Sequence, residues 1–452
     1  MSALDFPNPV ALPSELNYAL PTSLPKASFR EVRQPPNLQT YTTAGQVMQF
    51  DIPSGRSGDF ADPTTTYIHY FATFTSAGAN ATDFSYLLGS AYSFFLKQEV
   101  YGNNSVLLEQ INELGILGNM LLLNQLNDAE RRGYSAALGT GFSATAYSAS
   151  ATVGHRIFFN QTTENLTFEY AIPIIGILGH GTNKLIPVGE ISGLRFELTL
   201  DALTNFTLGV TANKLATFTL SNIEFVANYI NLDSSSLELI HSLNPQYLHI
   251  RTQTYKETTN FLPAGSGAGT YDLTASLRLS SVKSLYTTCY PSNAIEGKYA
   301  SANPNLVQGT SWIIGGQSYP QRTLDPSNKP ADCFMELKKS FGSMSYTTFI
   351  GCINKNGYYT SSTNNGLMFA YNTNVANVIT NPNQFFLGID TEVLPRKESL
   401  LSGINTASSS TMAFRSQVGT ALSAYQHTFV FFAYYDMILE IDRNTKTIIA
   451  KF

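Results

Sequence analysis

The chain has 452 residues, which is enough for two large all-β domains of about 200 residues each or for two or three ordinary domains. Charged residues make up 13% of it, about half the ~25% of an average soluble domain, so much of its surface is expected to be polar but uncharged. The net charge of -5 gives no electrostatic reason to expect nucleic acid along the chain, and the apolar run 429–435 is far shorter than the ~20 residues that span a bilayer.

Residues 1–40 are predicted to form an extended arm that takes its shape from a neighbouring molecule. Acidic and basic residues nearly cancel in this segment, and it lacks the charged start and apolar centre of a secretory signal. Its prolines favour an extended backbone; they are Pro7, Pro9, Pro13, Pro21, Pro25, Pro35 and Pro36.

Strict two-residue alternation of apolar and polar side chains dominates the rest of the chain and predicts half-buried antiparallel strands. The clearest apolar sets are Met48, Phe50 and Ile52; Leu166, Phe168, Tyr170 and Ile172; Leu194, Phe196, Leu198 and Leu200; and Leu273, Ala275, Leu277 and Leu279.

Two stretches have helical spacing. Over 112–132, Leu114, Leu117 and Leu121 form an apolar stripe, and a helix is predicted to end near Gly133. Over 329–341, Pro330 suits the first turn, and two lysines suit the negative end of the helix dipole.

These helices belong to a repeat. Each follows an apolar strand, a glycine-containing turn and a second strand; the two units are SFFLKQEV, SVLLEQI and the first helix, and SWII, QSYPQRT and the second helix. Each half closes on a long apolar strand, ending at Asp233 or Asp442, at nearly the same distance from its turn. We therefore predict two copies of one fold, 41–240 and 241–452, joined near 234–246, with a C-terminal hairpin that covers the last edge.

About eight strands in roughly 200 residues, with long polar loops and an inserted helix, fit a jelly roll better than an immunoglobulin-type sandwich. The predicted fold class is all-β: two tandem eight-stranded antiparallel jelly rolls with a few short helices. In SWIIGGQSYPQRTL, PADCFMELKKSFG and the closing YYDMILEIDRNTKTIIAKF, the sequence resembles the double jelly-roll major capsid proteins of icosahedral DNA viruses, the lineage of tailless phages, virophages, polinton-like viruses and the adenovirus hexon.

This resemblance implies a structural protein of the virion capsid, assembled inside the host cell. It implies homotrimeric, nearly hexagonal capsomers that tile a shell around a DNA genome, with penton and minor capsid proteins as further partners and no sequence-specific nucleic-acid binding; an internal membrane is left undecided. The arm is expected to lock neighbouring capsomers. Three alternatives stay open: a single-jelly-roll capsid protein with a projecting domain, a carbohydrate-binding or glycan-cleaving β-sandwich, and a fibre or spike protein.

No catalytic, cofactor-binding or metal site is predicted, and no cofactor is expected. The histidines, His69, His155, His180, His241, His249 and His427, have no metal-binding spacing and are interpreted as polar residues on strands or loops. The glycine-rich stretch 265–269 lacks the Lys-Ser/Thr of a phosphate-binding loop, so a simple loop is expected. Asp390 and Glu392 could form half of a glycosidase or Ca²⁺ site, but two acids on one strand face are more often a solvated face.

The remaining candidates are structural or depend on modification. Cys289, Cys333 and Cys352 show no CxxC spacing, which favours a reducing compartment and inert thiols. Trp312, the single tryptophan, is predicted to fill the second core. Five sequons make glycosylation conceivable, although no signal peptide is recognised; they begin at Asn80, Asn103, Asn160, Asn165 and Asn205.

Overall fold

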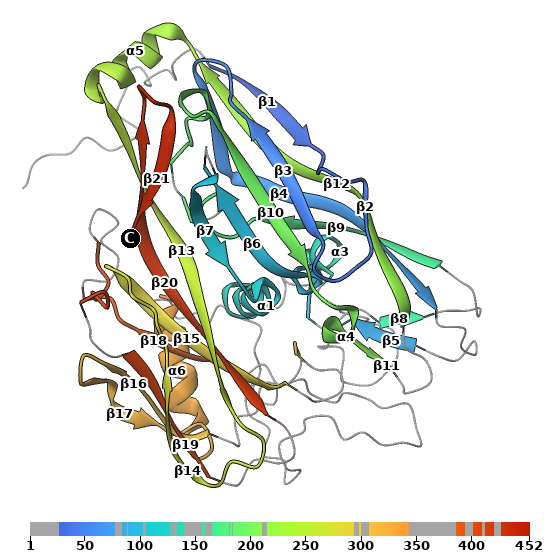
Figure 1. Ribbon diagram of the computed structural model, residues 1–452, viewed down its shortest axis with the longest axis vertical. Coiled ribbons are helices and arrows are strands. Elements are labelled where there is room, and N and C mark those ends of the chain that lie inside the picture. Colours follow the sequence, from blue (N-terminus) through green and yellow to red (C-terminus); the bar gives the residue numbers. More distant parts are fainter. Residues whose placement is uncertain are drawn as a thin grey trace, which may run out of the picture.

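The structure, a computed structural model, describes residues 27–452 except 77–83, 88, 103–104, 127–129, 131–132, 140–155, 159–164, 180, 183, 210–214, 293–297, 300–306, 343–385, 394–400, 409–411 and 420–425. Within these residues the strands form five antiparallel sheets (Figure 1). No helix of the described part is long and apolar enough to cross a membrane.

The first half of the chain builds two facing sheets. One has the order β1-β12-β4-β9, and the other has the order β3-β10-β6-β7. Their bounds are β1 (Ala27–Gln34), β12 (Leu215–Leu232), β4 (Asp59–Ser76), β9 (Asn165–Pro173), β3 (Val47–Pro53), β10 (Gly193–Leu200), β6 (Phe95–Tyr101) and β7 (Leu107–Ile111), with β2 (Thr40–Tyr41) added to β12. A small third sheet joins β11 (Thr207–Gly209), β5 (Phe84–Leu87) and β8 (Arg156–Phe158).

The second half repeats this arrangement. Its sheets have the orders β13-β20-β15-β18 and β14-β19-β16-β17, so each half has eight strands in two four-stranded paths. Their bounds are β13 (Tyr247–Leu262), β20 (His427–Asp442), β15 (Val282–Pro291), β18 (Leu387–Asp390), β14 (Gly269–Thr274), β19 (Met412–Val418), β16 (Val307–Ile314) and β17 (Gln317–Leu324). The hairpin predicted at the C-terminus is β21 (Thr447–Lys451), which pairs with β20. The predicted all-β class of two eight-stranded jelly rolls is confirmed.

The helices confirm one boundary prediction and correct two others. The helices are α1 (Leu114–Gln125), α3 (Ser135–Leu138), α4 (Leu203–Phe206), α5 (Ser234–Leu243) and α6 (Pro330–Ser340), with 3-10 turns η2 (Ala91–Phe94) and η4 (Val188–Glu190). The prediction for α6 was correct within a residue at each end. The predicted helix 112–132 is shorter than expected because Leu126 is already extended. The segment 234–246, expected to be a simple joint, contains α5, whose cap is the side chain of Asp233 accepting a 3.1 Å bond from the Ser236 amide.

Alternation predicts most of the strands because each has one face on a core. Along β10 every second residue is buried. Leu273 also lies in a strand, but β14 ends at Thr274, so the prediction of a continuous strand through Leu279 was wrong. Alternate side chains stay buried there without a ladder, and the backbone is satisfied by another segment. The Leu277 and Leu279 carbonyls accept bonds from the Thr406 hydroxyl, and the Leu279 carbonyl also accepts the Thr406 amide.

The two cores are built alike. In the first, Phe50 and Phe196 of one sheet meet Phe225 of the facing sheet, with ring centroids 5.8 to 6.3 Å apart. In the second, Trp312 lies edge-on to Phe414 of its own sheet at 5.3 Å and to Phe431 of the facing sheet at 5.2 Å. The predicted core role of Trp312 is confirmed.

Candidate functional site at the junction of the two jelly rolls

The two jelly rolls meet along a junction formed by β7, α1 and the 174–192 loop on one side and by β13, α6 and β21 on the other. Backbone bonds cross it: the Gln253 amide donates to the Gly181 carbonyl at 2.8 Å, and the Ser192 amide donates to the Lys446 carbonyl at 3.1 Å. Figure 1 shows the long strands β13 and β20 running beside the first jelly roll, with α1 close to them. Charged side chains are buried at this junction, which makes it the chemically unusual region of the described chain.

Glu109 of β7 is buried at the junction and lies against the second jelly roll. Its carboxylate accepts bonds from the Gln98 side chain at 2.9 Å, the Ile177 amide at 2.8 Å and the Thr254 hydroxyl at 2.5 Å. Thr254 belongs to β13, so the last of these bonds joins the two jelly rolls. Burial raises the pKa of Glu109 to about 7, although the three donors oppose the shift.

Two buried lysines also cross the junction. Lys298 lies 2.5 Å from a carboxylate oxygen of Glu113 and 3.2 Å from one of Asp201, so a cation of the second half is held by two acids of the first. Lys338 of α6 donates to the Asn124 side chain at 3.2 Å and lies 3.5 Å from the Asn124 backbone carbonyl in the last turn of α1. A cation stabilises that end of a helix, so α6 supplies α1 with a charge that its own last turn lacks.

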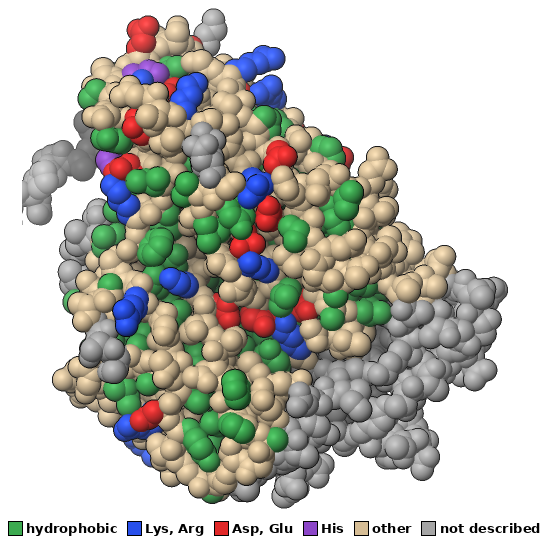
Figure 2. Space-filling model, viewed as in Figure 1, with side chains coloured by type: hydrophobic (Ala, Val, Ile, Leu, Met, Phe, Trp, Pro, Cys, Tyr) green, Lys and Arg blue, Asp and Glu red, His purple; other side chains and the backbone are tan. Residues whose placement is uncertain are grey.

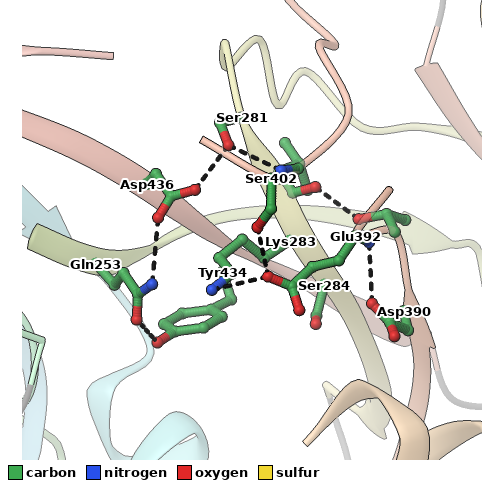
Figure 3. A network of polar contacts seen from close by, with 12 residues as sticks. Gln253, Ser281, Lys283, Ser284, Asp390, Glu392, Ser402, Tyr434 and Asp436 are labelled. Carbon is green, nitrogen blue, oxygen red and sulfur yellow. Dashed lines mark hydrogen bonds and ion pairs between the residues drawn. The ribbon is translucent and has the colours of Figure 1, made fainter. Parts of the chain in front are cut away.

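A third network surrounds Asp436, a buried acid within the apolar part of the closing strand β20. Asp436 accepts bonds from Arg251 at 2.7 Å, Gln253 at 3.2 Å and Ser281 at 2.8 Å. Figure 3 shows Gln253 and Ser281 bonded to this carboxylate, with the Tyr434 hydroxyl donating to Gln253. These contacts satisfy a charge that would otherwise interrupt the apolar strand at high cost.

The acids singled out in the sequence do not converge on one point. In Figure 3, Glu392 points to Lys283, 2.8 Å away, and accepts a 2.6 Å bond from the Ser402 hydroxyl, while Asp390 accepts the backbone amide of Glu392 at 2.9 Å. Each carboxylate is therefore engaged separately, and neither faces the other across an open site. In the described part of the chain, no three histidine, cysteine or acidic side chains are grouped so that they could hold a metal ion.

The other candidate residues lie apart from one another. His69, His241 and His249 each lie within 3.1 Å of a carboxylate, of Glu169, Glu190 and Glu440 respectively. His427 is buried at the start of β20, and residues 265–268 lie in the loop between β13 and β14, whose first residue is Gly269. Cys289 and Cys333 are buried thiols, and burial raises the pKa of Cys333 to about 12. His155, His180 and Cys352 lie outside the described residues.

Two of the five sequon asparagines are described. Asn165 is exposed at the start of β9, and its side-chain oxygen accepts a bond from Thr75 at 2.9 Å. Asn205 lies on α4, and its side-chain nitrogen donates to Asp201 at 2.7 Å. Asn80, Asn103 and Asn160 lie outside the described residues.

Sequence reasoning missed the buried charges at the junction. Glu109 lies in the predicted strand SVLLEQI, and Lys338 lies in the predicted helix 329–341, where it was assigned only to the helix dipole. Their burial depends on the other half of the chain, which a local pattern does not contain. The one available signal is the repeat itself, because two tandem copies of a fold in one chain can pack against each other.

Solved structures that resemble this chain over its full length are virus capsid proteins. No protein-family model matches the chain, and no curated protein matches its sequence. The PBCV-1 virus capsid gives a TM-score of 0.59 at 10% identity, covering 96% of this chain and 98% of that one. The Sputnik virophage structure gives 0.59 at 12% identity (100% and 94% covered), and the mavirus major capsid protein gives 0.53 at 10% identity (100% and 97% covered). The predicted resemblance is therefore confirmed at the level of the fold: this chain has the double jelly-roll fold of these viral capsid proteins.

Proposed function

We propose that this protein is a viral major capsid protein, located in the virion, which forms homotrimeric capsomers that tile an icosahedral shell around a DNA genome. The observation that carries the proposal is the repeat of one eight-stranded unit within a chain that matches capsid proteins from end to end. Three such chains around an axis would present six similar units, which is the shape that fills a six-fold lattice position.

The surface suits repeated contacts between copies. Figure 2 shows charged side chains scattered among uncharged polar ones, with hydrophobic side chains exposed between them. At the end of the molecule that carries α5, exposed apolar side chains include Phe29 (80% exposed), Leu239 (61%) and Leu243 (72%). Protein interfaces bury large apolar side chains such as these at their centres.

The proposed role is geometric and needs no catalysis. We take the two jelly rolls, 41–240 and 241–452, as the two upright units of each subunit, with the junction charges holding them at one angle. Strand β1, paired with β12, lies with the first unit, so the free arm of the proposal is residues 1–26. Penton and minor capsid proteins would fill vertices and seams.

The decisive experiment is the solution mass of the purified full-length protein by light scattering, with negative-stain images of the same peak. A species near three times 49.5 kDa with a hexagonal outline is expected. A clean monomer would overturn the trimeric capsomer. Binding on a glycan array or hydrolysis of a glycan by that monomer would support the carbohydrate-binding alternative.

A further inference from the structure

A groove lined by tyrosines begins at the junction and extends over the first jelly roll. One part is a cavity of about 490 Å³ between β4, α1 and α3 of the first jelly roll and β13 and β20 of the second. A second hollow of about 600 Å³ shares Tyr67, Tyr134, Leu138 and Pro173 with it and extends to Arg33 on β1. The tyrosines of the cavity are Tyr67, Tyr92, Tyr134, Tyr255 and Tyr434.

Two of these tyrosines, Tyr92 and Tyr255, are largely buried in the wall of the cavity, at 5% and 8% exposed, and the side-chain amides of Gln125 and Gln253 line the cavity beside them. Tyr255 and Tyr434 stack with their ring centroids 4.9 Å apart, and the Tyr434 hydroxyl donates to the Gln253 side chain. Tyr134 is 53% exposed at the rim, next to Gln125 at the end of α1. Aromatic-lined grooves of this kind bind proline-rich segments, whose stiff extended backbone packs on the rings and loses little entropy on binding.

The chain contains a segment with this chemistry. Residues 1–26 include five prolines, carry only Asp5, Glu15 and Lys26 as charged side chains, and have apolar residues between them. In an extended proline-type backbone 26 residues reach about 80 Å, enough to cross to an adjacent molecule. We propose that residues 1–26 of a neighbouring copy bind in this groove; this inference rests on the proposed assembly into a shell.

The direction of β1 favours a neighbour over the chain's own N-terminus. Ala27 pairs with Leu232 near α5, whereas Arg33, at the other end of the strand, lines the groove. Going toward the N-terminus, β1 therefore leads away from the groove over about 20 Å. A chain that filled its own groove would have to reverse its direction, while a segment from an adjacent molecule would not.

The test is site-specific photo-cross-linking of the full-length protein. A benzophenone side chain replaces Tyr134 at the rim of the groove, and a matched protein carries it at Tyr247, which is 38% exposed on β13 and does not line the cavity. After irradiation, denaturing gels separate dimers from monomers, and mass spectrometry of the linked peptides identifies the partner. We expect position 134, and not position 247, to form intermolecular links to residues 1–26.

Two further readouts separate the possible failures. Replacing Pro7, Pro9 and Pro13 by alanine is expected to lower the yield of these links several-fold without changing the mass by light scattering, because alanine lacks the preference of proline for an extended backbone. Trimers or particles in which position 134 captures no residue of 1–26, or captures it only within the same chain, overturn this inference and leave the capsid proposal standing. A monomer without intermolecular links overturns both.

Discussion

At the residue scale, Glu109 makes the stability of the protein depend on pH. Its pKa is raised by burial to about 7 in the folded chain, above the value near 4.5 expected when it is unfolded. The protonated form therefore favours folding, and this contribution is complete below about pH 4.5 and lost as the pH rises through 7, at a cost of roughly 3 kcal/mol. Glu109→Gln should remove most of this dependence, so the variant gains unfolding free energy relative to the parent at pH 8 but not at pH 4.5.

Denaturant unfolding at both pH values measures this difference. Glu440→Gln is the matched control of opposite sign, because hydrogen bonds from Lys451 and His249 hold the pKa of Glu440 below its usual value. Glu440→Gln should have a lower unfolding free energy than the parent at neutral pH, and this difference should shrink as the pH falls. If the unfolding free energies of the parent and of Glu109→Gln depended on pH in the same way, burial would not raise the pKa of Glu109.

Asp436 supports a second prediction at this scale. Its carboxylate is inaccessible to solvent and receives Arg251, Gln253 and Ser281. Asp436→Asn leaves the Arg251 cation without its acid in a mostly buried place, and we expect a loss of about 3 kcal/mol in unfolding free energy. Asp272→Asn is the control, because its pair with Arg415 also joins two strands but is about half exposed, and it should cost under about 1 kcal/mol. Similar losses in both variants would contradict this account.

At the element scale, the local sequence pattern predicts a strand or helix correctly where one of its faces packs on a core. It fails where residues far away in the sequence determine the hydrogen bonds of the segment. Strand β10 and helix α6 have full patterns and end signals, and both were predicted almost to the residue. The stretch that follows β14 has the same alternation, yet Thr406 takes the bonds that a neighbouring strand would have made. Helix α5 has apolar residues at helical spacing, Leu237, Ile240 and Leu243, and a cap at Asp233, yet it buries none of its side chains.

Strand β1 carries the prediction at this scale. It covers β12 from Ala27, opposite Leu232, to Gln34, opposite Phe225. Removing residues 1–26 should leave the melting temperature close to that of the parent, whereas removing 1–34 uncovers the edge of β12 and should lower the melting temperature and cause aggregation. Differential scanning fluorimetry with size-exclusion chromatography compares the two. Equal behaviour of both truncations would mean that β1 contributes nothing to the fold.

At the scale of the whole molecule, the duplication was predictable and the joining of its halves was not. The two strand-turn-strand-helix units and the two closing strands occur in the sequence at matching distances, and they occupy matching places in the sheets. The relative placement of the halves depends on Glu109, Lys298 and Lys338. Each of them bonds to a residue of the other jelly roll that is more than 90 positions away in the sequence. Such partners leave no local pattern.

Charge at this scale separates two ways of assembling a shell. A capsid protein that gathers its genome with a basic arm needs a polyanion, and its assembly weakens steeply with salt because bound counterions are released. Here the net charge is -5, and the first 26 residues contain one lysine, two acids and no arginine. We expect nuclease-treated protein, free of nucleic acid by its absorbance ratio, to form empty shells. Their yield by light scattering should change little between about 0.1 and about 0.5 M salt, a range over which charge-driven assembly would weaken steeply. The control is a variant with Lys-Lys-Lys-Lys added before residue 2, whose assembly should depend on added DNA. Shells that appear only when DNA is supplied to the parent protein would show that some other surface of the chain neutralises phosphate, and that contacts between uncharged faces are not what drives assembly.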